Sequence, residues 1–194
     1  MSGGVDSSVA AGLLKQQGYE VIGVHMKCWS QSSSDACGVG APCGAAQDAQ
    51  DARQAAEVLE IPFYVFDFED GYKKEVVKYM VDGYEKGITP NPDVMCNKEI
   101  KFGLFLKKAL EMGADYIATG HYVRLQRRTM NQELGIKKIK KPSFLIHNSL
   151  FIAKDTSKDQ SYFLWTLTQE QLQYCLFPIG DYIKSDVRKM ARKF

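Results

Sequence analysis

A short stretch at the start of the chain has the composition of a phosphate-binding loop. It consists of Ser2, Gly3, Gly4, Val5, Asp6, Ser7 and Ser8. Adjacent glycines let successive backbone N–H groups turn toward one anion, and the helix expected over residues 9–17 adds the positive end of its dipole. The hydroxyls are further donors, and Asp6 is suited either to hold Mg²⁺ or to orient the loop. Two glycines alone are equally typical of a helix N-terminus capped by Ser and Asp.

A second group of reactive side chains lies in residues 87–97, a proline-containing stretch expected to be a loop before a helix that begins near residue 99. Cys96 lies just ahead of that helix, and both a helix N-terminus and the nearby Lys98 and Lys101 would lower the pKa of its thiol. Asp93 is placed to act as a general base or to orient a substrate edge. From composition alone, Cys96 could equally be a buried small hydrophobe.

The string SGGVDSS resembles the PP-loop of the ATP pyrophosphatases, which cleave ATP between the α and β phosphates and attach AMP to a substrate oxygen. A Walker loop needs a Gly-Lys pair, and the sequence contains none. Together with NPDVMCNKEIKFG, GHY and KDQSYFL, in this order, the string makes nearly all of the chain resemble the tRNA-specific 2-thiouridylase family. These enzymes convert the wobble uridine of some tRNAs to 2-thiouridine.

The resemblance implies a reaction and a set of site residues. ATP adenylates the uracil C2 oxygen, and a persulfide on the nucleophile Cys96 then delivers sulfur as AMP leaves. The segment implied to contact the target base is Asn91, Pro92 and Asp93, and the implied ATP contacts outside the loop are Met26 and Gly120. The implied tRNA contacts are His121, Lys158, Asp159 and Gln160. The implied cofactors and partners are ATP, Mg²⁺, a tRNA anticodon loop and a protein sulfur donor.

His121 and the segment 158–160 also have simpler interpretations. His121 could be an ordinary loop histidine whose ring is satisfied by neighbours. Residues 158–160 could cap a helix at Ser161, and Asp159 could both cap that helix and contact tRNA. The base of an anticodon loop can be splayed out without opening a duplex, which lowers the cost of reaching it.

The expected elements predict an α/β fold with an open parallel sheet and helices on both faces, Rossmann-like and of the adenine nucleotide α-hydrolase type. Strands are expected over residues 21–26, 63–66 and 116–119, and helices over 9–17, 48–59, 69–86 and 99–112. Ligands of such sheets bind beyond the carboxyl ends of the strands, where Met26 and Gly120 lie. A basic hairpin over 122–154 and short helices over 160–165, 168–176 and 185–194 are expected to follow.

This order predicts a nucleotide-binding catalytic domain over residues 1–154 and a helical segment that contacts tRNA over residues 155–194. Relative to the family pattern, the first strand, the second catalytic cysteine, a linker domain and a β-barrel domain are absent. We therefore expect a fragment truncated at both ends. Cys175, in an apolar stretch expected to be helical, is interpreted as a packing residue rather than as that second cysteine.

The overall composition is that of a globular protein, with 194 residues and a formal net charge of +2. No run of apolar residues is long enough to cross a membrane, and no signal peptide is recognisable. The odd count of five cysteines indicates a reducing compartment, so a cytoplasmic location is expected. The resemblance implies a monomer.

Positive charge is concentrated in the expected hairpin. Between residues 124 and 141, Glu133 is the one acidic residue, and the basic residues are Arg124, Arg127, Arg128, Lys137, Lys138, Lys140 and Lys141. Such an arm suits a phosphate backbone, although charged tips of hairpins are commonly only solvated.

The cysteines at 28, 37 and 43 match no standard zinc spacing. Unpaired thiols are favoured over a metal site, and an iron–sulfur cluster that includes Cys96 is a lesser hypothesis.

Two functions compete with tRNA thiolation. A PP-loop synthetase that adenylates a small molecule would explain the first loop but neither the Cys96 segment nor the basic arm. An inactive nucleotide- or RNA-binding fragment would explain all motifs without turnover. ATP–pyrophosphate exchange with and without tRNA separates the synthetase from tRNA thiolation. A thermal melt tests the binding fragment, because a missing central strand should weaken the cooperative transition.

Overall fold

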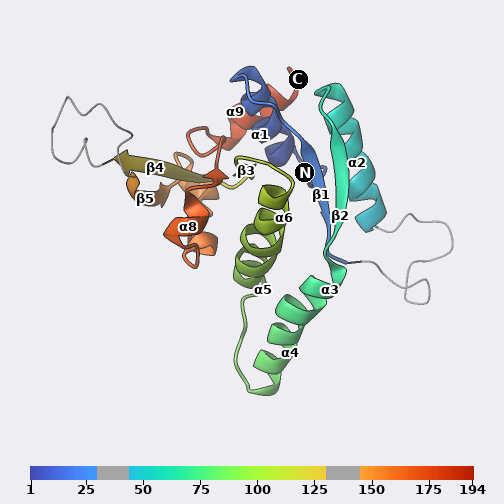
Figure 1. The fold of residues 1–194 in the computed structure, drawn as a ribbon, viewed down its shortest axis with the longest axis vertical. Coiled ribbons are helices and arrows are strands. Elements are labelled where there is room, and N and C mark those ends of the chain that lie inside the picture. Colours follow the sequence, from blue (N-terminus) through green and yellow to red (C-terminus); the bar gives the residue numbers. More distant parts are fainter. Residues whose placement is uncertain (30–43, 130–144) are drawn as a thin grey trace.

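The computed structural model describes residues 1–29, 44–129 and 145–194 of the chain. Its parallel strands form two hydrogen-bonded pairs (Figure 1). One pair consists of β1 (Gly23–Lys27) and β2 (Phe63–Asp67), and the other of β3 (Ile117–Ala118) and β6 (Cys175–Leu176). The α/β class with parallel strands is therefore confirmed. β6 was not expected from the sequence, because two residues are too few to show an apolar period.

Helices connect the strands. They are α1 (Val5–Gln16), α2 (Gly44–Val58), α3 (Glu69–Tyr72), α4 (Lys78–Glu85), α5 (Pro92–Met95), α6 (Leu106–Glu111), α8 (Gln169–Leu172) and α9 (Lys184–Ala191). Two π-helical segments, η1 (Lys73–Val77) and η2 (Cys96–Phe105), join α3 to α4 and α5 to α6. Two 3₁₀ turns, η3 (Thr156–Lys158) and η4 (Ser161–Leu164), precede α8. Among the described residues, every helix is too short or too polar to span a bilayer.

The β1–β2 pair has helices on both faces. Side chains alternate between the faces of a strand, so Met26 of β1 lies on the same face as its register partner Phe66. This face packs against α5 and η2 in a core of Phe66, Phe68, Val76 and Ile100. On the other face, the Arg53 guanidinium of α2 lies 5.4 Å from the centre of the Phe63 ring. The alternation thus directs Met26 toward the helix that carries Cys96.

Residues 155–194 pack onto the rest of the chain. α9 lies beside α1 (Figure 1), and the two helices share a core that includes Val9, Leu13, Ile179 and Val187. A second core joins η2 and β3 to Leu164 and Cys175. The C-terminal elements are therefore placed to supply side chains to a site on the rest of the chain.

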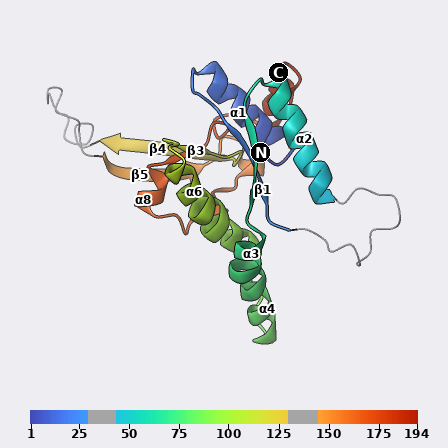
Figure 2. The same cartoon turned by 45° about the vertical axis from the view of Figure 1, so that its right-hand side comes forward.

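The expected hairpin is present. β4 (Val123–Thr129) pairs antiparallel with β5 (Leu145–Ile152), and the hairpin extends away from the β1–β2 pair, on the opposite side from α2 (Figure 2). Two arginines of the basic arm bond to backbone carbonyls: Arg124 Nε donates to Ile152 O at 2.9 Å, and Arg127 donates to Cys175 O at 3.1 Å. The four lysines of the arm, at 137, 138, 140 and 141, lie outside the described residues.

Several expected boundaries were wrong. α1 begins at Val5 rather than at residue 9, because Gly4 adopts the extended conformation of an N-cap residue. Residues 168–176 are not one helix: α8 ends at Leu172, and Cys175 pairs with Ile117 in a strand. The expected helix over 160–165 is the short 3₁₀ turn η4. Cys175 is nevertheless fully buried, as expected of a packing residue.

Candidate active site

The first loop leaves the N-terminus of α1 open. Gly4 caps this helix without a side-chain hydrogen bond, and the first intrahelical bond runs from Ser8 N to Gly4 O at 3.4 Å. Gly3 has a φ of +75°, and a Cβ there would lie 2.9 Å from Asp48 O of α2. Glycine is thus required at position 3 for both conformation and space. The loop can direct the first backbone N–H groups of a twelve-residue helix toward an anion.

The serines brace this loop from within. Ser2 N donates to Ser7 Oγ at 3.2 Å, and the hydroxyl of Ser8 donates to Gly4 O at 3.0 Å. These bonds hold the loop in one shape before any ligand arrives. The exposed hydroxyl of Ser2 lies 3.3 Å from that of Ser7, so both hydroxyls face the same region.

Gly120 contacts the start of α1 directly. A Cβ at this position would lie 2.8 Å from both Asp6 C and Ser7 N, which are backbone atoms that cannot move aside easily. The close approach places the end of β3 against the phosphate loop. Thr119 and His121, on either side, are joined by a hydrogen bond of 2.8 Å between Oγ1 and Nδ1. The structure thus brings together two predicted ATP contacts that are far apart in sequence.

The Asp6 carboxylate is held by two residues that sequence reasoning did not assign. Lys184 Nζ lies 2.6 Å from both oxygens, and the hydroxyl of Tyr122 donates to Oδ1 at 2.9 Å. Burial, aided by the hydrogen bond to Asp6, raises the pKa of Tyr122 and keeps this hydroxyl protonated as a donor. Lys184 is the first residue of α9. Because the Lys184 ammonium pairs with both oxygens of the Asp6 carboxylate, the arrangement fits an orienting role for Asp6. It does not fit direct coordination of Mg²⁺ by this residue.

Removal of the Lys184 ammonium is expected to weaken nucleotide binding. In Lys184→Ala the part-buried Asp6 loses its ion pair, and the change should raise the Kd for a non-hydrolysable ATP analogue about tenfold, or ~1–2 kcal/mol. Lys189→Ala is the matched control, because Lys189 lies on the same helix and pairs at the surface with Asp186. Calorimetric titration of both variants is the measurement. Equal affinities would contradict a role for the Lys184–Asp6 pair.

Cys96 lies within a helix, which corrects the expectation of a loop over residues 87–97. The helix begins at Pro92, not near residue 99, because proline suits its first position and the Asn91 Oδ1 accepts from Val94 N at 3.1 Å as the N-cap. Cys96 is the first residue of η2 and lies beyond the turn whose N–H groups are free. The helix N-terminus therefore acts on Asn91–Met95 more than on the thiol.

The pKa of Cys96 is raised, whereas the sequence predicted that it is lowered. Burial is the largest cause and the Asp93 charge raises it further, while Lys101 lowers it. Lys98, the other expected cation, forms an ion pair of 2.7 Å with Glu99. Cys28 packs against the same apolar core as Cys96, and the two thiols interact electrostatically. Burial, and secondarily the charge of Cys96, raise the pKa of Cys28 to about 11.

The raised pKa predicts slow alkylation of Cys96 at neutral pH. The fraction of thiolate grows as pH rises through the pKa, so the rate with iodoacetamide should keep rising beyond the pKa of ~8.5 typical of free cysteine. Mass spectrometry of the Cys96 peptide at a series of pH values measures this rate. Lys101→Met should move the profile to higher pH, since Lys101 lowers the pKa. A plateau below about pH 8 would show an activated thiol instead.

The predicted target-base segment is at the surface beside Cys96. Asn91 and Asp93 are exposed, and the backbone carbonyl of Asp93 accepts from Asn97 Nδ2 at 2.9 Å. The Asp93 carboxylate acts on the pKa of Cys96 through its charge, so the two side chains are neighbours. An exposed carboxylate next to a half-buried thiol can accept a proton from a substrate that approaches from solvent.

The four predicted tRNA contacts differ in what they expose. His121 is 8% exposed, with its ring centre 6.0 Å from that of Phe102, and burial lowers its pKa to about 3. Gln160 Oε1 accepts from Tyr122 N at 3.0 Å, and Asp159 accepts from Ala153 N at 2.8 Å and from the Ser161 hydroxyl. The side chains of His121, Asp159 and Gln160 therefore make hydrogen bonds within the protein. Lys158 is exposed and presents its charge to solvent.

Comparison with known proteins places this chain in a family. The model of the tRNA methyl transferase HUP domain matches residues 1–194. The chain belongs to this family. Curated relatives named tRNA-specific 2-thiouridylase MnmA include those of Levilactobacillus brevis, 51% identical over 100% of this chain and 46% of the relative, and Christiangramia forsetii, 50% identical over 98% and 45%. That of Caldicellulosiruptor saccharolyticus is 46% identical over 100% and 50%. The chain spans about half the length of the curated relatives it matches.

Within this tRNA methyl transferase HUP domain, the phosphate loop, Gly120, Tyr122 and Lys184 form one cluster. Cys96 and Cys28 gather on the face of β1 that carries Met26, and Asp93 lies three residues before Cys96 in the same helix. The charge of Lys101 lowers the pKa of both Cys96 and His121, the residue after Gly120. Lys184 is one of many lysines in the sequence, and no local pattern distinguishes it as the partner of Asp6.

The domain shows no cluster of three or more potential metal ligands among its described residues. Cys37 and Cys43 lie outside those residues, so the hypothesis of a metal or iron–sulfur site that includes them is not tested. Cys28 and Cys96 are both free thiols.

Proposed function

We propose that this protein catalyses ATP-dependent 2-thiolation of the wobble uridine in tRNA. One observation carries the proposal. The fold contains both a helix N-terminus that is open to a phosphate, at α1, and a cysteine with a nearby carboxylate at the surface, Cys96 and Asp93. Curated relatives that match the whole chain carry the name of a tRNA-specific 2-thiouridylase. The proposal extends that activity to this chain.

In the first half-reaction the phosphates of ATP bind at the N-terminus of α1. Backbone N–H groups and the hydroxyls of Ser2, Ser7 and Ser8 stabilise the charge that develops as pyrophosphate leaves. Gly120 lets the end of β3 approach the loop closely, and Met26 offers an apolar contact to adenine at the end of β1. Asp6, held by Lys184, fixes the loop rather than a metal ion. The uracil C2 oxygen attacks the α phosphorus, and a C2–O–AMP bond forms.

In the second half-reaction the terminal sulfur of a persulfide on Cys96 attacks C2. The C2–O bond breaks and AMP leaves with the oxygen, while a second thiol attacks Cys96 Sγ and cleaves its bond to the transferred sulfur. Cys96 is left in a disulfide with that thiol, so no external oxidant is needed. Asp93 accepts or orients the uridine proton, and Asn91 and Pro92 shape the edge of the target pocket. A protein that carries a persulfide is the proposed sulfur donor.

The test is release of pyrophosphate from ATP by the protein with and without tRNA, accompanied by nucleoside analysis of the tRNA. Release that requires tRNA, together with 2-thiouridine at the wobble position, supports the proposal. Release without tRNA would favour a small-molecule synthetase. Absence of release while ATP and RNA still bind would favour a binding protein without turnover.

A further inference from the structure

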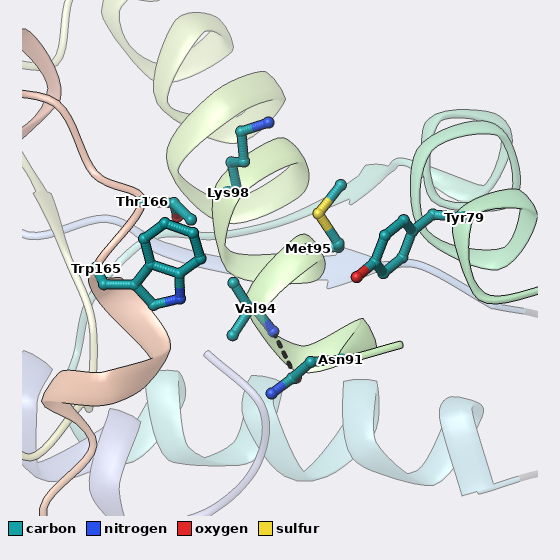
Figure 3. Close-up of a pocket in the computed structure, with 7 residues that line it drawn as sticks. All are labelled: Tyr79, Asn91, Val94, Met95, Lys98, Trp165 and Thr166. Carbon is teal, nitrogen blue, oxygen red and sulfur yellow. Dashed lines mark hydrogen bonds between the residues drawn. The ribbon is translucent and has the colours of Figure 1, made fainter. Parts of the chain in front are cut away.

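A groove of about 550 Å³ runs along the helix that carries Cys96 (Figure 3). Its lining includes Tyr79, Asn91, Met95, Lys98, Trp165 and Thr166. Positions 91, 95 and 98 recur at helical spacing and share one face, whereas Cys96 points about 100° away from Met95. The groove therefore shares Asn91 with the proposed target-base segment, and Cys96 is not among its lining residues.

Aromatic side chains from two separate elements flank this groove. Trp165 follows η4 and is 75% exposed, and Tyr79 of α4 is 39% exposed on the opposite side (Figure 3). Leu164, directly before Trp165, is 1% exposed, and Leu167 N donates to Leu164 O at 3.1 Å. The buried leucine and this tight turn hold the backbone that presents the indole to solvent. An exposed indole on a rigid support is prepared to stack against a flat ligand.

Polar groups in the groove have hydrogen-bonding capacity that the protein does not use fully. The buried Thr166 Oγ1 has no hydrogen-bond partner in the described part of the chain. The Asn91 side chain uses its oxygen to cap the helix, which leaves its NH₂ donors available. The Lys98 ammonium forms an ion pair of 2.7 Å with Glu99, and its side chain is still 46% exposed, so a phosphate can approach it from solvent. An amide donor, a hydroxyl and a cation around an aromatic pair match the edges of a nucleobase and the phosphate beside it.

We propose that this groove binds a nucleobase of the anticodon loop adjacent to the target uridine, stacked on Trp165 and bordered by Tyr79. This inference rests on the proposed function. RNA is favoured over a protein occupant because the groove combines exposed aromatic faces with a cation and continues directly into the Asn91–Asp93 segment. A base held here would fix the register of the loop, so that the next base reaches Cys96.

Trp165 can report its own occupancy. The chain contains two tryptophans, Trp29 and Trp165, so a Trp29→Phe background makes Trp165 the only one. We expect an anticodon stem-loop RNA with a wobble uridine to quench this fluorescence. Stem-loops with an abasic site at single loop positions identify the stacked base, because quenching should be lost at one position next to the target.

Affinity variants complete the test. Trp165→Ala should raise the Kd for the stem-loop about tenfold, whereas Trp165→Phe should keep most of the affinity. Tyr84→Ala is the control for loss of an exposed aromatic side chain, because Tyr84 of α4 is 59% exposed and does not line the groove. Unquenched fluorescence and unchanged affinity of Trp165→Ala, with RNA still bound and thiolated, would overturn this inference alone. If Trp165→Ala binds RNA normally but no longer receives sulfur from the donor protein, the proposal of a bound nucleobase is overturned in favour of a protein occupant. No RNA binding by the unaltered protein would overturn the proposed function as well.

Discussion

Cys96→Ser is expected to abolish 2-thiouridine formation while tRNA-dependent pyrophosphate release continues. A serine hydroxyl cannot carry a persulfide, so sulfur transfer should fall by at least about a thousandfold. Adenylation depends on the N-terminus of α1 and on Gly120, and these groups belong to a different cluster from Cys96. The variant should therefore complete the first half-reaction and stop at the activated base.

The measurement is parallel quantification of pyrophosphate and of 2-thiouridine in one reaction. Cys175→Ser is the matched control, because Cys175 Sγ donates to Gln171 O at 3.1 Å and a serine hydroxyl can make the same bond. Burial raises the pKa of Cys175 to about 12, so its thiol is a poor nucleophile and its loss should leave thiolation intact. Continued thiolation by Cys96→Ser would remove Cys96 from the mechanism.

Gly120→Ala is expected to remove most ATP binding. The added methyl group would lie 2.8 Å from Asp6 C and Ser7 N, so the phosphate loop or the end of β3 must shift. Overpacking of this kind costs about 1–3 kcal/mol, and a shifted loop no longer directs its N–H groups at one phosphate. We expect the Kd for the ATP analogue to rise by about a factor of 30, with the larger part of the effect on binding rather than on folding.

Gly71→Ala is the control for a glycine substitution in general. Its added Cβ would lie 2.5 Å from Leu104 Cδ1, the far end of a flexible side chain that can move. Calorimetric titration and thermal melting of both variants separate binding from stability. If Gly120→Ala binds ATP like Gly71→Ala, the contact between β3 and the loop is not part of the nucleotide site.

Local patterns in the sequence were sufficient for much of the fold. Apolar runs bounded by glycine or proline predicted β1, β2 and β3, and the change in residue composition after residue 121 predicted the β4–β5 hairpin. The two loops with candidate chemistry were recognised from residue type and spacing, because N–H groups, hydroxyls and thiols act over a few residues of chain. The helix start at Pro92 was missed because Asn91 and Pro92 were interpreted as loop formers, although they are equally favourable as an N-cap and a first helical residue.

The sequence by itself determined which groups are available for phosphate and sulfur chemistry, and tertiary structure alone decided how they are tuned. Lys184 reaches Asp6 across a separation of 178 residues, and no local pattern encodes that ion pair. The direction of the Cys96 pKa shift followed from burial by packing against Phe66 and Ile100, which outweighs the lysine charge. Trp165 and Tyr79 line one groove only because η4 and the continuous segment of η1 and α4 lie beside the same helix. Burial, long-range ion pairs and shared grooves depend on contacts between distant segments, and these exist only once the chain has folded.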